Sequence, residues 1–205
     1  MSTEHSGSVA CVVLAAGTST RMGTNKLLLH LEGEPVVRRA AQHALAAGLE
    51  PVVVVLGHES VLVRQAIGDV ASRLQLVVNP DYMLGVNSSL KAGIESLPAT
   101  VGAAVVMLAD MPFVTAAMLS GLLTKYRAST APLVISDYDG VNAPPMLYDR
   151  ALFGELMTTE GEGCGRAVVK RHRTDAAVLT WPAAALNDLD VPADYDRIRE
   201  SMRRG

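Results

Sequence analysis

Residues 9–17 read Val-Ala-Cys-Val-Val-Leu-Ala-Ala-Gly, an apolar run that closes on small residues. Because no position on either face of this run is polar, it is typical of a strand buried on both sides in a parallel sheet. Gly17 then lets the chain turn and approach a ligand closely. Four further short apolar runs are followed within two residues by Gly, Asn or Asp: 52–56, 74–78, 103–109 and 133–135.

Between these runs, apolar residues recur with the period of an α-helix. The clearest stretch is 35–47, where the apolar positions follow an i, i+3, i+4 spacing and Gly48 marks the end. Similar stretches cover residues 59–67, 88–97 and 115–126. Thr115 is a candidate N-cap for the last of them. Strand and helix therefore alternate over residues 9–127, which predicts βαβ units with right-handed crossovers.

The sequence predicts one α/β domain over residues 1–205, with a Rossmann-like, mostly parallel sheet and helices on both faces. After residue 131 the pattern loosens, because turn-forming residues fill 138–148 and three glycines fall within 160–165. A last helix is expected to begin at Pro192, since proline suits the first helical position. In open sheets of this kind, ligands bind beyond the carboxyl ends of the strands. The loops that directly follow the apolar runs are therefore the places to look for chemistry.

The composition argues against several classes of protein. The chain has 205 residues, a net charge of −3, and only 2 Phe, 1 Trp and 5 Tyr, which argues against a basic or base-stacking face for nucleic acid. Two cysteines cannot build a disulfide framework, and Cys11 is expected to be a small core residue. The N-terminus lacks the pattern of a signal peptide, and no apolar run approaches the roughly 18 residues of a membrane helix. We therefore expect a cytoplasmic protein without membrane contact.

The loop after the first run is rich in small and polar residues and contains two cations. It reads Leu14-Ala15-Ala16-Gly17-Thr18-Ser19-Thr20-Arg21-Met22-Gly23-Thr24-Asn25-Lys26. Backbone N–H groups together with Arg21 and Lys26 suit a polyphosphate. The pattern is neither a Walker A motif nor the Gly-x-Gly-x-x-Gly fingerprint of dinucleotide-binding proteins. The alternative is a polar surface turn with two solvated bases.

Other polar residues follow later runs. Asp110 directly follows the run 103–109, so its carboxylate is expected at the carboxyl edge of the sheet, where it can hold Mg²⁺ or cap a helix. Asp190 precedes the predicted last helix and offers a second carboxylate, or a cap. Ser88 or Ser89 is expected to cap the helix over 88–97 and to bind a base edge or ribose, or to cap it alone.

The loop pattern Leu-Ala-Ala-Gly-x-Ser-x-Arg-Met-Gly-x-x-Lys resembles the signature loop of MobA-like nucleotidyltransferases. It is most similar to that of the molybdenum cofactor cytidylyltransferases. The resemblance implies the nucleotide-diphospho-sugar transferase type of fold and catalytic roles for Lys26, Arg21 and Asp110. It also implies that a nucleoside triphosphate is bound by Leu14, Ala15, Ala16, Gly17, Gly23 and Lys26. The Ala-Ala-Gly form is similar to that of CTP-using members, whereas guanylyl-transferring relatives usually show Ala-Gly-Gly.

The resemblance extends to the motifs that bind the metal ion and the nucleotide in this family. Asp110-Met111-Pro112 looks identical to the family motif whose Asp is a metal ligand, and Asp190 matches a second ligand, with Val191 where Thr is usual. The implied cofactor is Mg²⁺. Gly85 and Ser89 match a family pattern that contributes to nucleotide binding.

The acceptor side is implied more loosely. Pro145 and Arg166 match acceptor-binding positions, although Ala143 stands where the family commonly has Gly. Cys164 is either a reactive thiol or a small turn residue. The basic cluster at 170–173 is either a solvated face or an attractor for an anionic pterin phosphate.

The function these patterns imply is Mg²⁺-dependent transfer of CMP, or another nucleotide, to the terminal phosphate of molybdopterin. Residues 9–127 would bind the nucleotide, and residues 131–192 would bind the acceptor and complete the metal site. CTP and a molybdopterin-type acceptor are the expected partners, and a molybdenum hydroxylase is a candidate recipient of the product. Three alternatives remain: a sugar phosphate or methylerythritol phosphate as acceptor, a non-catalytic cofactor-delivery protein, and a dinucleotide-binding oxidoreductase. The methylerythritol enzymes usually show Pro-Lys-Gln where this chain has Asn25-Lys26-Leu27.

Overall fold

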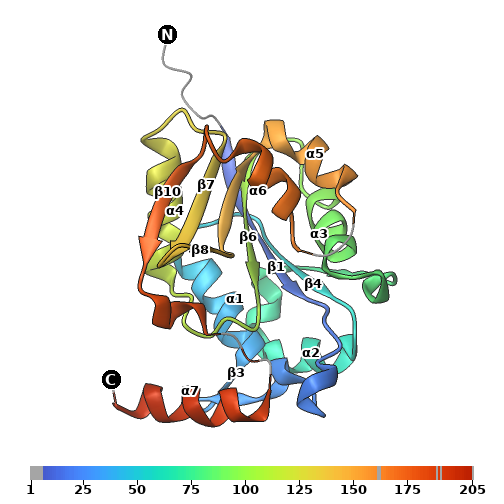
Figure 1. Ribbon diagram of the computed structural model, residues 1–205. Helices are drawn as coiled ribbons and strands as arrows, with labels where there is room; N and C mark the ends of the chain where they lie inside the picture. Colours follow the sequence, from blue (N-terminus) through green and yellow to red (C-terminus); the bar gives the residue numbers. More distant parts are fainter. Residues whose placement is uncertain (1–6, 161–162, 188, 190, 205) are drawn as a thin grey trace.

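A computed structural model describes residues 7–160, 163–187, 189 and 191–204, and a single large sheet forms its centre (Figure 1). Its strands are β1 (Ser8–Ala15), β4 (Val52–Leu56), β5 (Gln75–Val78), β6 (Val101–Leu108), β7 (Leu133–Tyr138), β8 (Val141–Asn142), β9 (Met146–Asp149) and β10 (Ala177–Trp181). Their order is β10-β7-β9-β6-β1-β4-β5, with β8 paired to β7. A separate small hairpin joins β2 (His30–Leu31) to β3 (Glu34–Pro35).

Helices cover both faces of the sheet. They are α1 (Val36–Ala46), α2 (Ser60–Ile67), α3 (Val86–Glu95), α4 (Ala116–Arg127), α5 (Phe153–Thr158), α6 (Arg166–His172) and α7 (Pro192–Arg204). Helices α1, α2 and α4 contribute to one buried apolar cluster, and α3, α5 and α6 contribute to a second one. The two clusters lie on opposite sides of the sheet, because successive side chains of a strand point to opposite faces.

The central strand β1 shows why this sequence makes a two-sided sheet. Cys11 and Val13 belong to the cluster under α1, whereas Val12 and Leu14 belong to the cluster under α3. All four side chains are buried. Burial raises the pKa of the Cys11 thiol far above its ordinary value, so Cys11 is a small apolar core residue, as the sequence predicts.

The predicted fold class is confirmed. All five apolar runs form strands, and β1–β4, β1–β6, β4–β5 and β7–β10 are parallel pairs. Each predicted helical stretch forms a helix, with bounds that shift by two residues or fewer. The Thr115 side chain accepts a hydrogen bond from the backbone N–H of Met118 at 3.3 Å, which confirms it as the N-cap of α4.

Further regular structure lies within the looser region after residue 131. Strand β9 runs antiparallel between β6 and β7, where Leu147 pairs with Val105 on one side and with Val134 on the other. Strand β10 then extends the sheet beyond β7, and α5 and α6 pack on one face of the sheet, over β7 and β9. The part expected to bind the acceptor therefore stands on the same sheet as the part expected to bind the nucleotide.

Helix α7 begins at Pro192, as predicted, and packs against the β2–β3 hairpin. The Tyr195 hydroxyl donates to the backbone carbonyl of His30 at 2.8 Å. With 13 residues, α7 is the longest helix in the described part of the chain. No helix there is both long and apolar enough to cross a bilayer, which takes about 20 residues.

Candidate active site

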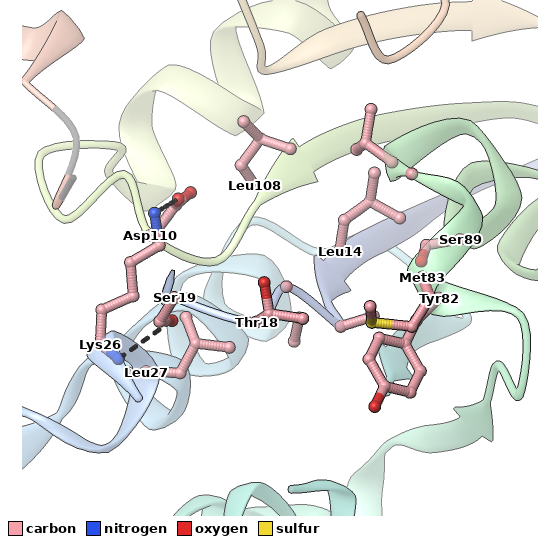
Figure 2. A pocket seen from close by; sticks show the side chains of 15 residues that line it. Leu14, Thr18, Ser19, Lys26, Leu27, Tyr82, Met83, Ser89, Leu108 and Asp110 are labelled. Carbon is pink, nitrogen blue, oxygen red and sulfur yellow. Dashed lines mark hydrogen bonds and ion pairs between the residues drawn. The ribbon is translucent and has the colours of Figure 1, made fainter. Parts of the chain in front are cut away.

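A pocket of about 340 Å³ opens where β1 and β6 end, at the carboxyl edge of the sheet (Figure 2). The structure brings together in its lining eight of the residues that the sequence singled out: Leu14, Ala15, Ala16, Gly17, Lys26, Gly85, Ser89 and Asp110. They come from the first loop, from the start of α3 and from the end of β6. This is the edge at which ligands bind in open α/β sheets.

The first loop folds back on itself and is held at both ends. Ser19 adopts a left-handed backbone conformation with φ near +53°, which costs a residue other than glycine about 1 kcal/mol or more. Its Oγ accepts a hydrogen bond from the backbone N–H of Lys26 at 3.2 Å, seven residues later. The side chains of Met22 and Leu27 are buried and anchor the loop to the protein interior. The loop is therefore a preformed rim of the pocket.

Lys26 is held in place by its neighbours in the sequence. Asn25 caps a short 3₁₀ helix, because its Oδ1 accepts a hydrogen bond from the backbone N–H of Leu27 at 3.1 Å. The buried Leu27 side chain fixes the orientation of this turn. Lys26 Nζ then lies 2.5 Å from Oδ2 of Asp110, and the two side chains are only 13% and 17% exposed (Figure 2). Lys26 and Asp110 thus form an ion pair that is largely shielded from solvent in the pocket.

Asp110 is placed by the sheet. The backbone N–H of Ala109 donates to the carbonyl of Leu14 at 3.0 Å, which ties the end of β6 to the end of β1. On its other side, the backbone N–H of Leu189 donates to the carbonyl of Asp110 at 3.1 Å. Asp190, the second predicted metal ligand, lies outside the described residues.

The donors in the pocket suit Mg²⁺. Mg²⁺ is commonly bound by one or two carboxylates and keeps waters and substrate phosphates as its other ligands. Within the described residues, no three His, Cys, Asp or Glu side chains gather into a cage made by protein alone. Asp110 supplies one hard oxygen donor to the pocket, which fits a Mg²⁺ ion that takes its other ligands from water and substrate.

The start of α3 differs from the sequence prediction. The helix begins at Val86 after Gly85, whose φ of +102° favours glycine, and no side chain caps it. The expectation that Ser88 or Ser89 is the N-cap is therefore wrong. Ser88 instead donates back to the carbonyl of Gly85 at 2.8 Å, and Ser89 lies buried one residue further on, in the pocket lining (Figure 2). Gly85 occupies the N-cap position with a backbone conformation that favours glycine, so the helix begins two residues before Ser88.

A second cavity of about 590 Å³ adjoins the first, and Val86 and Leu108 line both. Three cations from one face of α6 and its C-terminal end line this cavity: Arg166, Lys170 and Arg173. Their spacing of four and then three residues places them on the same side of a helix. No acidic side chain is among its described lining residues, and most of its walls are apolar. The cavity therefore suits an anion with an apolar body.

The rest of the basic cluster points away from this cavity. Arg171 and His172 both bind the carboxylate of Glu155 on α5, His172 with Nε2 at 2.8 Å from Oε1. Hydrogen bonds from His172 and Arg171 hold the pKa of Glu155 below its ordinary value. The cluster at 170–173 thus divides into two cations that line the cavity and two residues that fasten α6 to α5.

The structure also places Pro145 and Cys164, the remaining residues that the sequence singles out on the acceptor side. Pro144, and not Pro145, lines the second cavity, while the carbonyl of Pro145 accepts a hydrogen bond from the Ser136 hydroxyl at 2.6 Å. Cys164 lines the cavity with a positive φ of 42°, and burial, with a contribution from Asp110, raises the pKa of its thiol to about 12. A thiol with so high a pKa is not a nucleophile at neutral pH, so the reading as a small turn residue fits the structure.

Arg21 and Gly23 lie on the first loop but outside the pocket lining. Arg21 is exposed on the 3₁₀ turn that also contains the buried Met22, and Gly23 ends that turn with φ near +70°. Sequence reasoning missed several lining residues: Thr18, Ser19, Leu27, Tyr82, Met83, Val86 and Leu108. Six of these seven lie within two positions of a predicted site residue, so nearness to a motif in the sequence was the available signal. Tyr82 and Met83 come from a 3₁₀ turn, and no hydrophobic periodicity in the sequence predicts this turn.

Comparison with known proteins agrees with this geometry. Residues 11–177 match the MobA-like NTP transferase domain. The purine catabolism protein PucB of Bacillus subtilis is 31% identical over 201 residues, which cover 93% of this chain and 96% of that protein. The bifunctional protein GlmU of Kineococcus radiotolerans is 34% identical over 195 residues, but the matching part spans only 39% of its length.

The solved structures support the same assignment. Rv0371c of Mycobacterium tuberculosis superposes with a TM-score of 0.83 at 26% identity, covering 96% of this chain and 99% of that one. A second structure of Rv0371c is a complex with manganese, with a TM-score of 0.80 and the same identity. The match to the domain covers most of the chain, from the first strand to β10. The chain belongs to the MobA-like NTP transferase family and is a nucleotidyltransferase.

Proposed function

We propose that this nucleotidyltransferase joins CMP from CTP to the terminal phosphate of a molybdopterin-type acceptor and releases pyrophosphate. One observation carries the proposal. The pocket that holds the Lys26–Asp110 pair shares two wall residues with an apolar cavity lined by three cations and no described acid. A triphosphate in the first pocket and a phosphate-bearing heterocycle in the second would meet at Val86 and Leu108.

The pocket proposed for the nucleotide has small residues at the end of β1, which would leave room for the base. Leu14, Ala15 and Ala16 form the wall at the end of β1, and Gly17 leaves its neighbourhood open. Tyr82 is the one aromatic residue among the described lining residues, so little of the base contact would come from aromatic stacking. The Ala-Ala-Gly form of the loop supports CTP as the donor.

The reaction needs positioning and charge stabilisation more than proton transfer. An oxygen of the acceptor phosphate bonds to the α-phosphorus of the nucleotide as the bond from that phosphorus to the β-phosphate oxygen breaks. A terminal phosphate has a second pKa near 6, so the attacking oxygen is already ionised at neutral pH and needs no general base. Lys26 would stabilise the developing charge at the α-phosphate, and Arg21 that of the leaving pyrophosphate.

The residues that would hold Mg²⁺ are Asp110 and, as a proposal from the sequence, Asp190. When bound, Mg²⁺ would neutralise charge on the phosphate oxygens. The manganese complex of Rv0371c supports a divalent cation in this fold. Asp110 also orients Lys26, since the two side chains lie in contact at 2.5 Å.

The acceptor cavity supports an anionic pterin. Arg166 stands at the start of α6, two residues after Cys164, and would hold the acceptor phosphate. Pro145 would act through its neighbour Pro144, which lines the cavity, because the Ser136 and Tyr138 hydroxyls donate to the carbonyls of Pro145 and Pro144. The dinucleotide product would then pass to a molybdenum hydroxylase.

Arg166→Ala is expected to raise the acceptor KM about tenfold or more and to leave the KM for CTP within threefold. A phosphate held by an arginine loses a charge-assisted hydrogen bond, which contributes about 1.5–3 kcal/mol. Initial rates of pyrophosphate release at varied acceptor and at varied CTP measure the two constants.

The matched control is Arg171→Ala, on the same helix but bound to Glu155 on the other side. It should leave the acceptor KM within twofold. Equal effects of the two substitutions, or an unchanged acceptor KM in Arg166→Ala, would refute the assignment of the second cavity to the acceptor.

A further inference from the structure

Three polar side chains form a hydrogen-bonded cluster against the nucleotide pocket: Asn79, Ser88 and Ser89. Asn79 follows β5 and is 4% exposed, and Ser89 in α3 is also 4% exposed. Of the three, only Ser89 lines the pocket. Because buried polar groups must find partners, the position of each proton in the cluster can be traced.

The orientation of the Asn79 amide is fixed by the backbone. Its Oδ1 accepts a hydrogen bond from the N–H of Asp81 at 2.9 Å, and a backbone N–H can only donate. The amide nitrogen therefore faces the two serines. Nδ2 lies 2.9 Å from Oγ of Ser88 and 3.0 Å from Oγ of Ser89, so both amide protons are used. Each serine oxygen is thus an acceptor toward Asn79.

The hydroxyl protons of Ser88 and Ser89 then differ in the acceptors that the protein offers them. The single hydroxyl proton of Ser88 has two acceptors within reach, the carbonyls of Gly85 and Asp81, each at 2.8 Å, so it stays within the protein. Ser89 has no acceptor for its proton among the described residues. Its side chain extends from α3 toward the pocket (Figure 2). The Ser89 proton is therefore available only to whatever occupies the pocket.

We infer that Asn79 is a positioning residue that makes Ser89 a hydrogen-bond donor toward the bound nucleotide. Ser89 then recognises a lone pair, such as a pyrimidine carbonyl oxygen or an unprotonated ring nitrogen, because an N–H edge at that place would leave the Ser89 proton without an acceptor. This inference rests on the proposed function only in that the pocket binds a nucleoside triphosphate. A cytosine ring offers such acceptors, whereas guanine turns N–H groups outward along much of its pairing edge.

The test compares binding of CTP with Mg²⁺ by calorimetry to the wild type and four variants. Asn79→Asp has the same shape and keeps the acceptor for Asp81, but its second oxygen takes the Ser89 proton and so turns the lone pairs of Ser89 toward the nucleotide. We expect it to raise the Kd about 30-fold, and Ser89→Ala to raise it about tenfold or more. The double variant Asn79→Asp with Ser89→Ala should be no weaker than Asn79→Asp alone, because the two residues act through one hydrogen bond.

The control is Ser88→Ala, which loses a hydrogen bond to the same amide but lies outside the pocket lining. It should stay within threefold of the wild type. In steady-state kinetics, Asn79→Asp should raise the KM for CTP and leave the acceptor KM within twofold, a split that a general loss of structure would not give.

Several outcomes would overturn the inference. Wild-type affinity in Asn79→Asp, or additive losses in the double variant, would show that Asn79 does not act through Ser89. Should Asn79→Asp fail to fold in a thermal melt, equal losses in Ser89→Ala and Ser88→Ala would have the same consequence. A wild type that binds CTP while the variants match it contradicts this inference alone, whereas a wild type that does not bind CTP contradicts the proposed function as well.

Discussion

Replacing Lys26 by alanine is expected to lower kcat for pyrophosphate release about 10³-fold while the melting temperature changes by only a few degrees. A preorganised cation in a partly dry pocket stabilises charge that develops in the transition state, and a 10³-fold loss corresponds to about 4 kcal/mol. Lys26 is 13% exposed and is held on a turn capped by Asn25, so its Nζ needs little reorganisation before it acts.

The Lys26→Ala measurement is a continuous assay of pyrophosphate release at saturating CTP, with circular dichroism to follow unfolding. Lys125→Ala serves as the control, because Lys125 lies in the last turn of α4 and outside the pocket. Activity of Lys26→Ala within tenfold of the wild type would refute its catalytic role. So would a loss of the same size in the control.

Asp110→Asn is expected to lower kcat by a similar factor, about 10³, and to raise the Mg²⁺ concentration needed for half-maximal rate. The substitution keeps the shape of the side chain but removes the charge that attracts a hard cation. It also removes the ionic partner of Lys26 at 2.5 Å, so the Lys26 side chain loses its orientation.

Two readouts separate these effects for Asp110. The first is a Mg²⁺ titration of the rate, in which an unchanged half-saturation point would contradict a metal-holding role. The second is the double variant Lys26→Ala with Asp110→Asn. Its loss should be clearly smaller than the product of the two single losses, because residues in contact couple energetically.

The part of the site that the sequence predicted lies where a strand ends. Gly17 and Asp110 directly follow buried apolar runs, and the carboxyl ends of parallel strands meet at one edge, so their juxtaposition follows from the pattern alone. Lys26 is further from its strand, but the length and specificity of the loop motif identified it. The Lys26–Asp110 contact itself needed the structure, since a hydrogen bond from Lys26 to Ser19 closes the loop.

The rest depended on contacts between distant parts of the chain. Strand β9 pairs antiparallel with both β6 and β7, and nothing local in four residues selects that register. In the sequence, Lys170 and Arg173 form one basic cluster with their neighbours. In the structure, helix α6 places Arg171 and His172 against Glu155, while Lys170 and Arg173 line the cavity. The prediction that Ser88 or Ser89 caps α3 failed because Gly85 occupies the N-cap position and the helix already begins at Val86.

The most direct test of the proposed function is an incubation of the protein with Mg²⁺ and each of CTP, GTP, ATP and UTP, with and without molybdenum-loaded molybdopterin. Pyrophosphate and the product mass are both measured. We predict pyrophosphate release only with CTP and the molybdopterin together, with a product heavier than the acceptor by one CMP unit. Release with another triphosphate in preference to CTP, or with a sugar phosphate or methylerythritol phosphate in place of molybdopterin, would contradict the proposal.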